Sequence, residues 1–289
     1  MKFCLSCQKP FSGEDWRCPS CGFQPAKSGG FPSFAPEFEK SNPYFPGDSF
    51  DRLADLEEHY FWFRSRNELI LWALRKWLEP KGKYLEVGCG NGFVLSAVGR
   101  AFPELELYGS EIHGQGLARA ATRVSGATLI QMDARQIPFR EEFNMVGLFD
   151  MLEHVPEDEK VLEQVREALK PGGGIILTVP QHPFLWSYVD EISRHVRRYH
   201  RQELVEKVRR AGFTLLGTTS FVSLLMPGLL LSRMGKKKTA PSFDPDKELK
   251  IHSGLDSVLG AALGFERFLI RCGVRFPFGG SILLAARKA

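Results

Sequence analysis

The nine residues YLEVGCGNG, from Tyr84 to Gly92, decide the fold of this chain. A short apolar run, typical of a buried strand, enters a turn that contains three glycines and leads into the helix-like segment VLSAVGRAF. Glycine permits positive φ and lets a ligand approach the backbone, so such a turn after a parallel strand forms the floor of many ligand sites. On its own the turn is also compatible with a nicotinamide-nucleotide fingerprint.

Strand-like and helix-like segments alternate on both sides of this turn. Helical periodicity covers residues 49–79, and after the turn LELYGSE, TLIQMDA, FNMVGLFDML and IILTVP have the pattern of strands separated by helices. FTLLGTTSFV and SILLAARK add two strands near the carboxyl end. The alternation predicts an α/β, doubly wound, Rossmann-like sheet of seven mostly parallel strands with right-handed crossovers.

Composition argues against several other classes of protein. The 289 residues are 43% hydrophobic and 25% charged, which is typical of globular chains and not of disordered, collagen-like or coiled-coil ones. The net charge of +4 gives no indication of a nucleic-acid partner. The amino-terminal residues lack the apolar core of a signal peptide, and the most apolar run, FVSLLMPGLLL, is short and contains Pro227. We therefore expect a cytoplasmic protein.

Four of the six cysteines lie within the first 21 residues. Two Cys-x-x-Cys pairs, separated by a hairpin-length segment, can place four thiolates around one tetrahedral ion. A closed set of four sulfurs favours structural zinc over an iron–sulfur cluster, and metal binding supplies folding energy to a segment with few apolar residues. We therefore predict a zinc ribbon over residues 1–25, with the ligands Cys4, Cys7, Cys18 and Cys21.

The rest of the chain divides into a linker and one large domain. Residues 26–48 mix Pro, Gly, Ser and Phe without helical or strand periodicity, which indicates a linker. Residues 49–289 form the predicted α/β domain. Its first helices, which carry the aromatic run Tyr60 to Phe63, are expected to act as a lid, and packing of this run into the core is the alternative role. Insertions are expected at about 181–200 and 221–272.

Acidic residues stand at the ends of the first three strands of the predicted sheet. Glu86 precedes the glycines, Glu111 ends the second strand and Asp133 closes the third. A carboxylate beside the glycine turn disfavours a diphosphate and favours an ammonium group, whereas an acid ~20 residues further on can accept the hydroxyls of a ribose. Three acids at neighbouring strand ends indicate a ligand that carries an amino acid, a ribose and an adenine, without phosphate.

From about Phe50 onward the chain resembles a class I S-adenosylmethionine-dependent methyltransferase of the bacterial methyltransferase-11/12-like subgroup. EVGCGNG matches the first motif of that family, and FDMLEHVPEDEKVLEQVREALKPGGGIILTVP completes the core pattern. The resemblance implies S-adenosylmethionine as cofactor, with Glu86 near its amino group, Glu111 on its ribose and Asp133 at its adenine edge. By position in the motifs, the expected cofactor-binding residues are Glu86, Gly88, Cys89, Gly90, Glu111, Ile112, Asp133, Ala134 and Phe149.

Methyl transfer from a sulfonium depends on alignment and exclusion of water more than on acid–base chemistry. A base is useful where the acceptor must lose a proton, as a hydroxyl does. The resemblance places His154 near the methyl end of the cofactor, and His195 lies in the first insertion, so these two histidines are candidate catalytic residues. Packing of the cofactor loop is the alternative role of His154. The basic run Arg194 to Tyr199 either clamps an acidic group of the acceptor or pairs with neighbouring acids.

The sequence therefore predicts S-adenosylmethionine-dependent methyl transfer to a small-molecule or glycan-type acceptor, including a lipid-linked one. An RNA methyltransferase that grips its substrate with the ribbon is a second interpretation, but the ribbon has few basic residues and a nucleic-acid partner is not favoured. A non-catalytic, cofactor-binding regulator or scaffold is a third. The patterns leave the acceptor atom and the oligomeric state open.

The apolar run from Phe221 to Leu231 is followed by Arg233 and by three consecutive lysines, Lys236–Lys238. An apolar segment beside basic residues is typical of contact with an anionic membrane, here at its inner face. A buried helix over the acceptor pocket, followed by a basic loop, is the alternative interpretation of the same residues.

Overall fold

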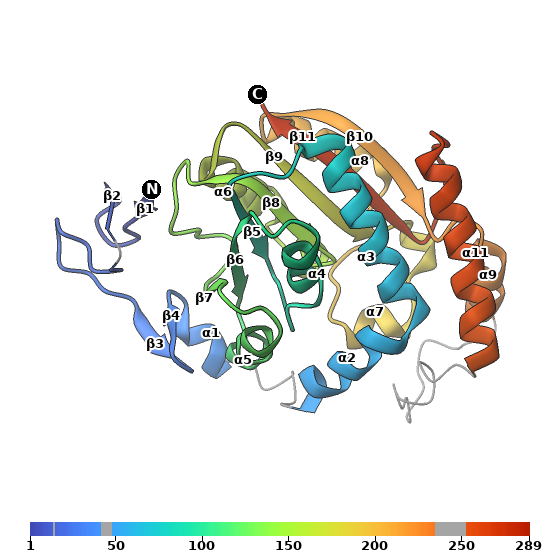
Figure 1. Ribbon diagram of the computed structural model, residues 1–289, viewed down its shortest axis with the longest axis horizontal. Coiled ribbons are helices and arrows are strands. Elements are labelled where there is room, and N and C mark those ends of the chain that lie inside the picture. Colours follow the sequence, from blue (N-terminus) through green and yellow to red (C-terminus); the bar gives the residue numbers. More distant parts are fainter. Residues whose placement is uncertain (14, 42–47, 235–252) are drawn as a thin grey trace.

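The computed structural model describes residues 1–13, 15–41, 48–234 and 253–289. A nine-stranded sheet in the order β10-β11-β9-β8-β5-β6-β7-β4-β3 runs through its centre (Figure 1). The strands β5 to β9 pair in parallel, and β11 is antiparallel to both of its neighbours. The predicted seven-stranded, mostly parallel sheet is confirmed as the core of this larger one: β5 (Lys83–Val87), β6 (Glu106–Glu111), β7 (Thr128–Gln131), β8 (Phe143–Phe149), β9 (Leu169–Pro180), β10 (Phe213–Phe221) and β11 (Ser281–Lys288).

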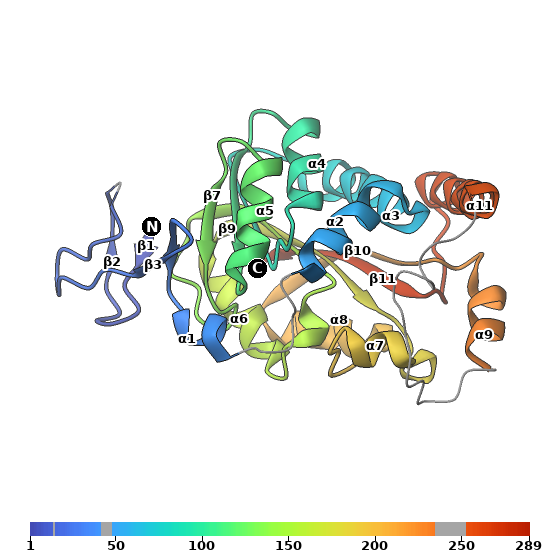
Figure 2. The ribbon, with the colours of Figure 1, turned by 90° about the horizontal axis from the view of Figure 1, so that it is seen from below.

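Helices cover both faces of the sheet, as Figure 2 shows. One face carries α2 (Asp48–His59), α3 (Phe61–Ala73), α4 (Phe93–Ala101), α5 (Gly114–Arg123) and α11 (Ser253–Arg271), and a π-helical turn, Leu74–Leu78, extends α3. The other face carries α6 (Asp158–Ala168), α7 (Tyr188–Ile192) and α8 (Arg201–Arg210), and α9 (Met226–Met234) lies beyond β10. Apolar residues at helical spacing fill the two cores, and Val161, Leu162 and Val165 of α6 are fully buried.

Two short strands extend the sheet beyond β7. They are β3 (Ala26–Ser28) and β4 (Phe31–Ser33), and the helix α1 (Pro36–Ser41) follows them. The absence of strand periodicity over residues 26–48 favours a linker, but a strand of three residues is too short to show an alternating pattern. The segment pairs with the edge of β7 through β4, because an exposed strand edge offers unpaired backbone groups. Residues 42–47 lie outside the described part of the chain.

The side chain of Gln131 joins the end of β4 to β7. Its amide oxygen accepts hydrogen bonds from Ser33 Oγ at 2.8 Å and from the Ala35 backbone nitrogen at 3.1 Å. Its amide nitrogen donates to the carbonyl oxygens of Ala35 at 2.7 Å and Ile112 at 3.0 Å. Because Gln131 is fully buried, these four bonds satisfy a group that would be costly to leave unpaired. They also tie the amino-terminal segment to Ile112, one of the expected cofactor residues.

The four-cysteine segment packs against the large domain. It contains β1 (Lys2–Phe3) and β2 (Pro10–Phe11), which pair with each other. The Phe3 nitrogen donates to the Pro138 carbonyl at 2.9 Å. Trp16 lies edge-on to Phe34 and to Phe139, with ring centroids 4.9 and 5.4 Å apart. This segment is therefore docked at the β7 end of the sheet, on the left of Figure 1.

No helix within the described ranges has both the length and the apolar character needed to cross a bilayer. The residues Lys236–Lys238, which the sequence places beside the apolar run, lie in the interval 235–252 outside those ranges. The apolar run begins at Phe221, the last residue of β10, and its last six residues, from Met226 to Leu231, form most of α9.

Candidate active site

A cavity of about 540 Å³ lies at the carboxyl ends of the strands β5 to β8. Helices α2 and α3 close it on one side with Phe50, Trp62 and Phe63. His154 also lines the cavity, whereas His195 lies behind His154 and does not. The structure brings together all nine residues that the sequence nominates for the cofactor: Glu86, Gly88, Cys89, Gly90, Glu111, Ile112, Asp133, Ala134 and Phe149.

Two glycines shape the floor of this cavity. Gly88 and Gly90 have φ values of +72° and +50°, a region that residues with a Cβ rarely adopt. A Cβ at Gly88 would lie 2.4 Å from the Cγ of Met151, so this position also requires glycine for packing. A Cβ at Gly90 would meet no protein atom within 4 Å. The backbone at Gly90 is therefore open to a ligand, as the glycine turn predicts.

The carboxylate of Glu111 lies between the glycine turn and the start of α5. It accepts hydrogen bonds from the backbone nitrogens of Gly90 at 3.1 Å, Ile112 at 2.8 Å and His113 at 3.2 Å. These donors fix the carboxylate at the end of β6. Oε1 accepts two of the bonds and Oε2 one, so Oε2 keeps capacity to accept a further bond. Glu111 is thus a pre-oriented acceptor for a hydroxyl-bearing ligand.

Asp133, the expected partner of the adenine edge, already has an ionic partner. Arg135 Nη2 lies 2.7 Å from one of its carboxylate oxygens, and Arg135 Nε lies 3.0 Å from the same oxygen. Arg135 also bonds Glu157 at 3.0 Å. The strand-end acids therefore are not freely solvated. Asp133 lines the cavity as half of an ion pair, a feature that its sequence position does not reveal.

Glu86 is the least ordinary of the three acids. Its side chain is 2% exposed, and the Tyr84 hydroxyl, at 3.4 Å, is a weak donor to it. Burial raises the pKa of the Glu86 carboxyl to about 8, although the positive charge of Arg66 acts in the opposite direction. A positively charged ligand group beside a buried carboxyl stabilises its ionised form, most of all where no cation of the protein lies close.

Arg66 is a site residue that the sequence interpretation missed. It lies on α3, is 8% exposed, forms an ion pair with Asp150 at the end of β8, and lines the cavity. The face of Trp62 lies 4.8 Å from its guanidinium carbon. Trp62 and Arg66 are four positions apart, which places both on one helix face, and that spacing is the signal that could have indicated the pair. A guanidinium here can bind a carboxylate.

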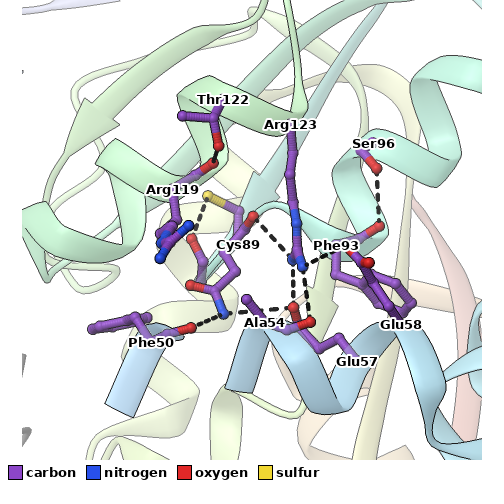
Figure 3. A network of polar contacts seen from close by, with 12 residues as sticks. Phe50, Ala54, Glu57, Glu58, Cys89, Phe93, Ser96, Arg119, Thr122 and Arg123 are labelled. Atoms are coloured by element: carbon purple, nitrogen blue, oxygen red, sulfur yellow. Dashed lines mark hydrogen bonds and ion pairs between the residues drawn. The ribbon is translucent and has the colours of Figure 1, made fainter. Parts of the chain in front are cut away.

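A polar network holds helix α2, the first part of the expected lid, to α5 and to the glycine turn (Figure 3). Arg123 of α5 forms an ion pair with Glu57 and donates to the Ala54 carbonyl at 3.1 Å. The Asn91 amide, next to the glycine turn, donates to the Phe50 carbonyl at 2.9 Å. Burial raises the pKa of Glu57, and Arg123 opposes that rise. The lid is thus connected to both the glycine turn and α5.

The two candidate histidines lie beside each other, with His154 at the cavity wall and His195 behind it. Their ring centroids are 4.8 Å apart, and His195 Nδ1 lies 2.9 Å from Asp190 Oδ1. His154 is exposed towards the cavity but is otherwise surrounded by protein. That burial, together with the neighbouring His195, lowers the pKa of His154 to about 4, although the carbonyls of Arg194 and Asp150 oppose the shift. His154 is therefore neutral at physiological pH.

Glu153 lies between these histidines and the sheet. It is fully buried, and neither of its carboxylate oxygens has a hydrogen-bond partner among the described residues. Burial raises its pKa well above the ordinary range. Within the described part of the chain, Glu153, His154 and His195 form one of two groups whose potential metal-ligating atoms lie within 4.8 Å of one another, and the four cysteines form the other.

The basic run Arg194 to Tyr199, within the first insertion, does not act as one clamp. Arg197 pairs with Asp158 at 2.7 Å, and Arg198 pairs with the buried Asp190 at 2.7 Å. The Tyr199 hydroxyl donates to Asp158 at 2.8 Å. The alternative, pairing with nearby acids, is therefore correct for these residues. Arg194 is the member of the run that lines the cavity.

The four amino-terminal cysteines converge as predicted. Cys4 Sγ and Cys21 Sγ are 3.6 Å apart, Cys7 Sγ and Cys18 Sγ are 3.7 Å apart, and all four sulfurs lie within 4.8 Å of one another. The backbone after the second cysteine of each pair turns with positive φ, at Gln8 and at Gly22. Four thiols at these distances fit a single tetrahedral metal ion.

The methyltransferase-domain family matches residues 46–217, which is more than half of the chain. The chain belongs to this family. The expected class I methyltransferase domain is confirmed, with a four-cysteine cluster in front of it.

Two curated proteins illustrate the relationship. This methyltransferase is 25% identical over 153 residues to a ubiquinone biosynthesis O-methyltransferase of Acinetobacter baumannii, and the match covers 46% of this chain and 64% of that protein. It is 28% identical over 185 residues to an uncharacterised protein of Methanocaldococcus jannaschii, with 60% and 84% covered. The chain thus spans less than two thirds of the length of the first of these relatives.

Solved structures support the same fold. A phosphoethanolamine N-methyltransferase of Haemonchus contortus, solved in complex with S-adenosylmethionine, is similar with a TM-score of 0.58 over 87% of this chain and 60% of that one, at 17% identity. At that identity the likeness concerns the fold alone.

Proposed function

We propose that this methyltransferase transfers the methyl group of S-adenosylmethionine to an oxygen atom of a small-molecule or glycan-type acceptor, including a lipid-linked one. The observation that carries the choice of an oxygen acceptor is the position of the His154 imidazole at the cavity wall, beside His195. A neutral imidazole can accept the proton that a hydroxyl loses when its oxygen is methylated. The similarity to an O-methyltransferase of Acinetobacter baumannii favours the same choice.

The residues around the cavity fit the cofactor. The open space above Gly90 leaves room for it, and Glu111 offers a pre-oriented carboxylate oxygen for a ribose hydroxyl. The buried Glu86 forms no ion pair with another described residue, and an ammonium group would supply that cation. Arg66 can bind the carboxylate of the same amino acid moiety. When bound, S-adenosylmethionine supplies an electrophilic methyl group on a sulfonium.

The chain's own residues then do three things. Phe50, Trp62 and Phe63 exclude water from the cavity, which strengthens the electrostatic interactions inside it. His154 takes the proton that the acceptor hydroxyl releases. The ion pair of Asp190 with Arg198 fixes the carboxylate that contacts His195, so that His195 is held beside His154.

We further propose that the four-cysteine cluster holds a structural zinc ion. All four ligand positions are filled by sulfur, so no position is open for a substrate. The contacts of Trp16 with Phe34 and Phe139 attach this module to the large domain. In this proposal the ribbon stabilises the β7 edge of the sheet.

Transfer of an isotopically labelled methyl group into a cell extract tests the acceptor class. The full chain is incubated with labelled S-adenosylmethionine, and the extract is separated into RNA, lipid and aqueous small-molecule fractions. Label in the lipid or small-molecule fraction, on an ether oxygen by mass spectrometry, supports the proposal. Label that is released by ribonuclease, or label on nitrogen or carbon, contradicts it.

Replacement of His154 with glutamine tests the proposed base. We expect the variant to bind S-adenosylhomocysteine as the unchanged protein does but to turn over about a hundredfold more slowly at saturating cofactor, since general base catalysis contributes roughly 10²–10⁴-fold. The turnover of the unchanged protein should show no titration of His154 between pH 6 and 8, because its pKa is about 4. Unchanged turnover of His154→Gln would eliminate the base role.

A further inference from the structure

Helix α11 presents a continuous apolar stripe to its surroundings. Val258, Phe265 and Phe268 are 64%, 57% and 59% exposed. Together with Ala261 and Cys272 they recur at intervals of three and four residues, which places them on one face of the helix. The rings of Phe265 and Phe268 are stacked, with centroids 6.5 Å apart. The outer face of a surface helix is ordinarily charged or polar, so this stripe indicates a face that something apolar covers.

The opposite face of α11 is anchored to the protein by its two acids. Asp256 accepts a hydrogen bond from the Phe61 nitrogen at 2.9 Å and pairs with Arg64 at 2.8 Å. Glu266 is 2% exposed and accepts from the backbone nitrogens of Ser223 at 2.7 Å and Leu224 at 2.8 Å. Both acids of α11 therefore face the domain, and the apolar stripe is an outer face.

Further apolar and basic residues gather at the same end of the molecule. Helix α9 lies at this end in both views, and its Leu231 is 71% exposed (Figures 1 and 2). Arg271 and Arg275 are exposed at the carboxyl end of α11. The two acids of α11, Asp256 and Glu266, face the domain, so these two arginines are charges that this end of the described structure presents outward.

We propose that this end of the protein docks on the surface of an anionic lipid bilayer, with the α11 stripe among the headgroups and the basic residues against lipid phosphates. A helix of 19 residues is about 28 Å long, which suits a helix that lies in the plane of the interface. The apolar stripe supplies buried area, and the exposed Arg271 and Arg275 supply attraction to anionic lipid. A second copy of the chain fits less well, because Arg271 and Arg275 would meet no acid of α11 on that face.

The same helix supports the lid of the cavity. Arg267 of α11 donates to Ser65 Oγ at 2.7 Å and pairs with Glu68 at 2.8 Å, both on α3. Helix α3 carries Trp62 and Arg66, which line the cavity. Contact of α11 with a bilayer would therefore bear, through α3, on the wall of the cavity that a lipid-linked acceptor has to enter. This last consequence rests on the proposed function, whereas binding to the bilayer does not.

Sedimentation with lipid vesicles tests the proposal on the full chain. Vesicles of phosphatidylcholine alone are compared with an equal mixture of phosphatidylcholine and phosphatidylglycerol, at about 0.1 M and about 1 M NaCl. We expect binding to the anionic vesicles that weakens at the higher salt. The double variant F265E/F268E should bind about tenfold or more weakly, because it places two charges in the apolar stripe. The variant F265L/F268L should keep most of the binding.

The variant Lys9→Glu is the matched control. It changes the net charge by the same two units, but on an exposed residue of the ribbon at the other end of the molecule. We expect it to bind vesicles as the unchanged chain does. Equal losses for Lys9→Glu and F265E/F268E would overturn the proposal, as would absence of binding to anionic vesicles.

A measurement of the molecular mass in solution tests whether a second copy of the chain covers the apolar stripe. A dimer that F265E/F268E converts to a monomer would assign the stripe to a second copy and overturn the proposal. Calorimetry with S-adenosylhomocysteine keeps the two proposals separate. Retained uptake of this ligand by F265E/F268E shows that a loss of vesicle binding is not a loss of fold, and loss of ligand uptake by the unchanged chain would count against the proposed function alone.

Discussion

Replacing Glu86 with glutamine removes a titrating carboxyl from the floor of the cavity while keeping its size and shape. In the folded protein, burial raises the pKa of Glu86 from 4.5 to about 8. In the unfolded chain the same carboxyl is ionised above about pH 5. Folding must therefore take up a proton at neutral pH, and the stability of the unliganded protein falls as the pH rises from 4.5 through 8.

The size of the effect follows from that difference in pKa. Glu86 costs the unliganded protein about 3 kcal/mol at pH 7 and about 5 kcal/mol at pH 9, where the penalty is complete. The glutamine variant carries no such penalty. Its free energy of unfolding relative to the unchanged protein should therefore increase by about 4 kcal/mol between pH 5 and pH 9. Urea denaturation across that range measures the difference.

Folding favours the protonated form of Glu86, whereas ligand binding should favour the ionised form. The ammonium group of S-adenosylhomocysteine favours the ionised form of Glu86, so binding near pH 7 should release a proton. Calorimetry in two buffers of different ionisation enthalpy detects that proton. Glu86→Gln should bind without proton release and about ten- to hundredfold more weakly, since a hydrogen bond to a charged group is worth about 1.5–3 kcal/mol.

The exposed acid Glu104 provides the control. Glu104→Gln should follow the unchanged protein in both experiments. Two results together would contradict the role given to Glu86. The difference in urea midpoint between Glu86→Gln and the unchanged protein stays constant from pH 5 to pH 9, and the two proteins bind S-adenosylhomocysteine with equal affinity. Glu86 would then have no raised pKa in the folded protein and no contact with the ligand.

Two further expectations concern the amino-terminal part of the chain. Gln131→Leu leaves the partners of a buried amide, among them Ser33 and Ala35, without their hydrogen bonds, and we expect a loss of about 2–4 kcal/mol in the free energy of unfolding; an unchanged urea midpoint would contradict it. Cys18→Ser removes one of four thiolates, so the zinc content by mass spectrometry should fall from one ion per chain towards none, with a change in Trp16 fluorescence as the ribbon undocks. Full zinc occupancy in that variant would show that Cys18 is not a ligand.

The parts of the fold and site that the sequence predicts are those encoded by local spacing. The glycine turn, the acids that follow each strand and the paired cysteines each reveal themselves within a few residues, because strand, turn and helix repeat over such distances. The structure brings these residues together at one sheet edge and in one cluster. That the nine cavity residues bind the cofactor stays a prediction.

The parts that the sequence hides depend on distant partners. Arg66 is positioned by its ion pair with Asp150, 84 positions away in the sequence. Strand β4 is positioned by its hydrogen bonds to Gln131 of β7. Neither relation leaves a periodic trace in the chain. Helix α11 illustrates another limit, since it has apolar residues on two faces and periodicity alone does not tell which one meets the domain. The contacts of Asp256, Glu266 and Arg267 with the rest of the domain identify the inner face.

The docking of the ribbon imposes an order on events during synthesis. The four cysteines have all been made by position 21, whereas Phe139, against which Trp16 packs, is made more than a hundred residues later. At ~5–20 residues per second the ribosome needs roughly 5 to 25 seconds for that interval. If the four cysteines hold zinc as proposed, the new ribbon can bind its metal before Phe139 has been made, while Trp16 lacks this packing partner. The supply of metal at that stage would then affect the yield of folded protein.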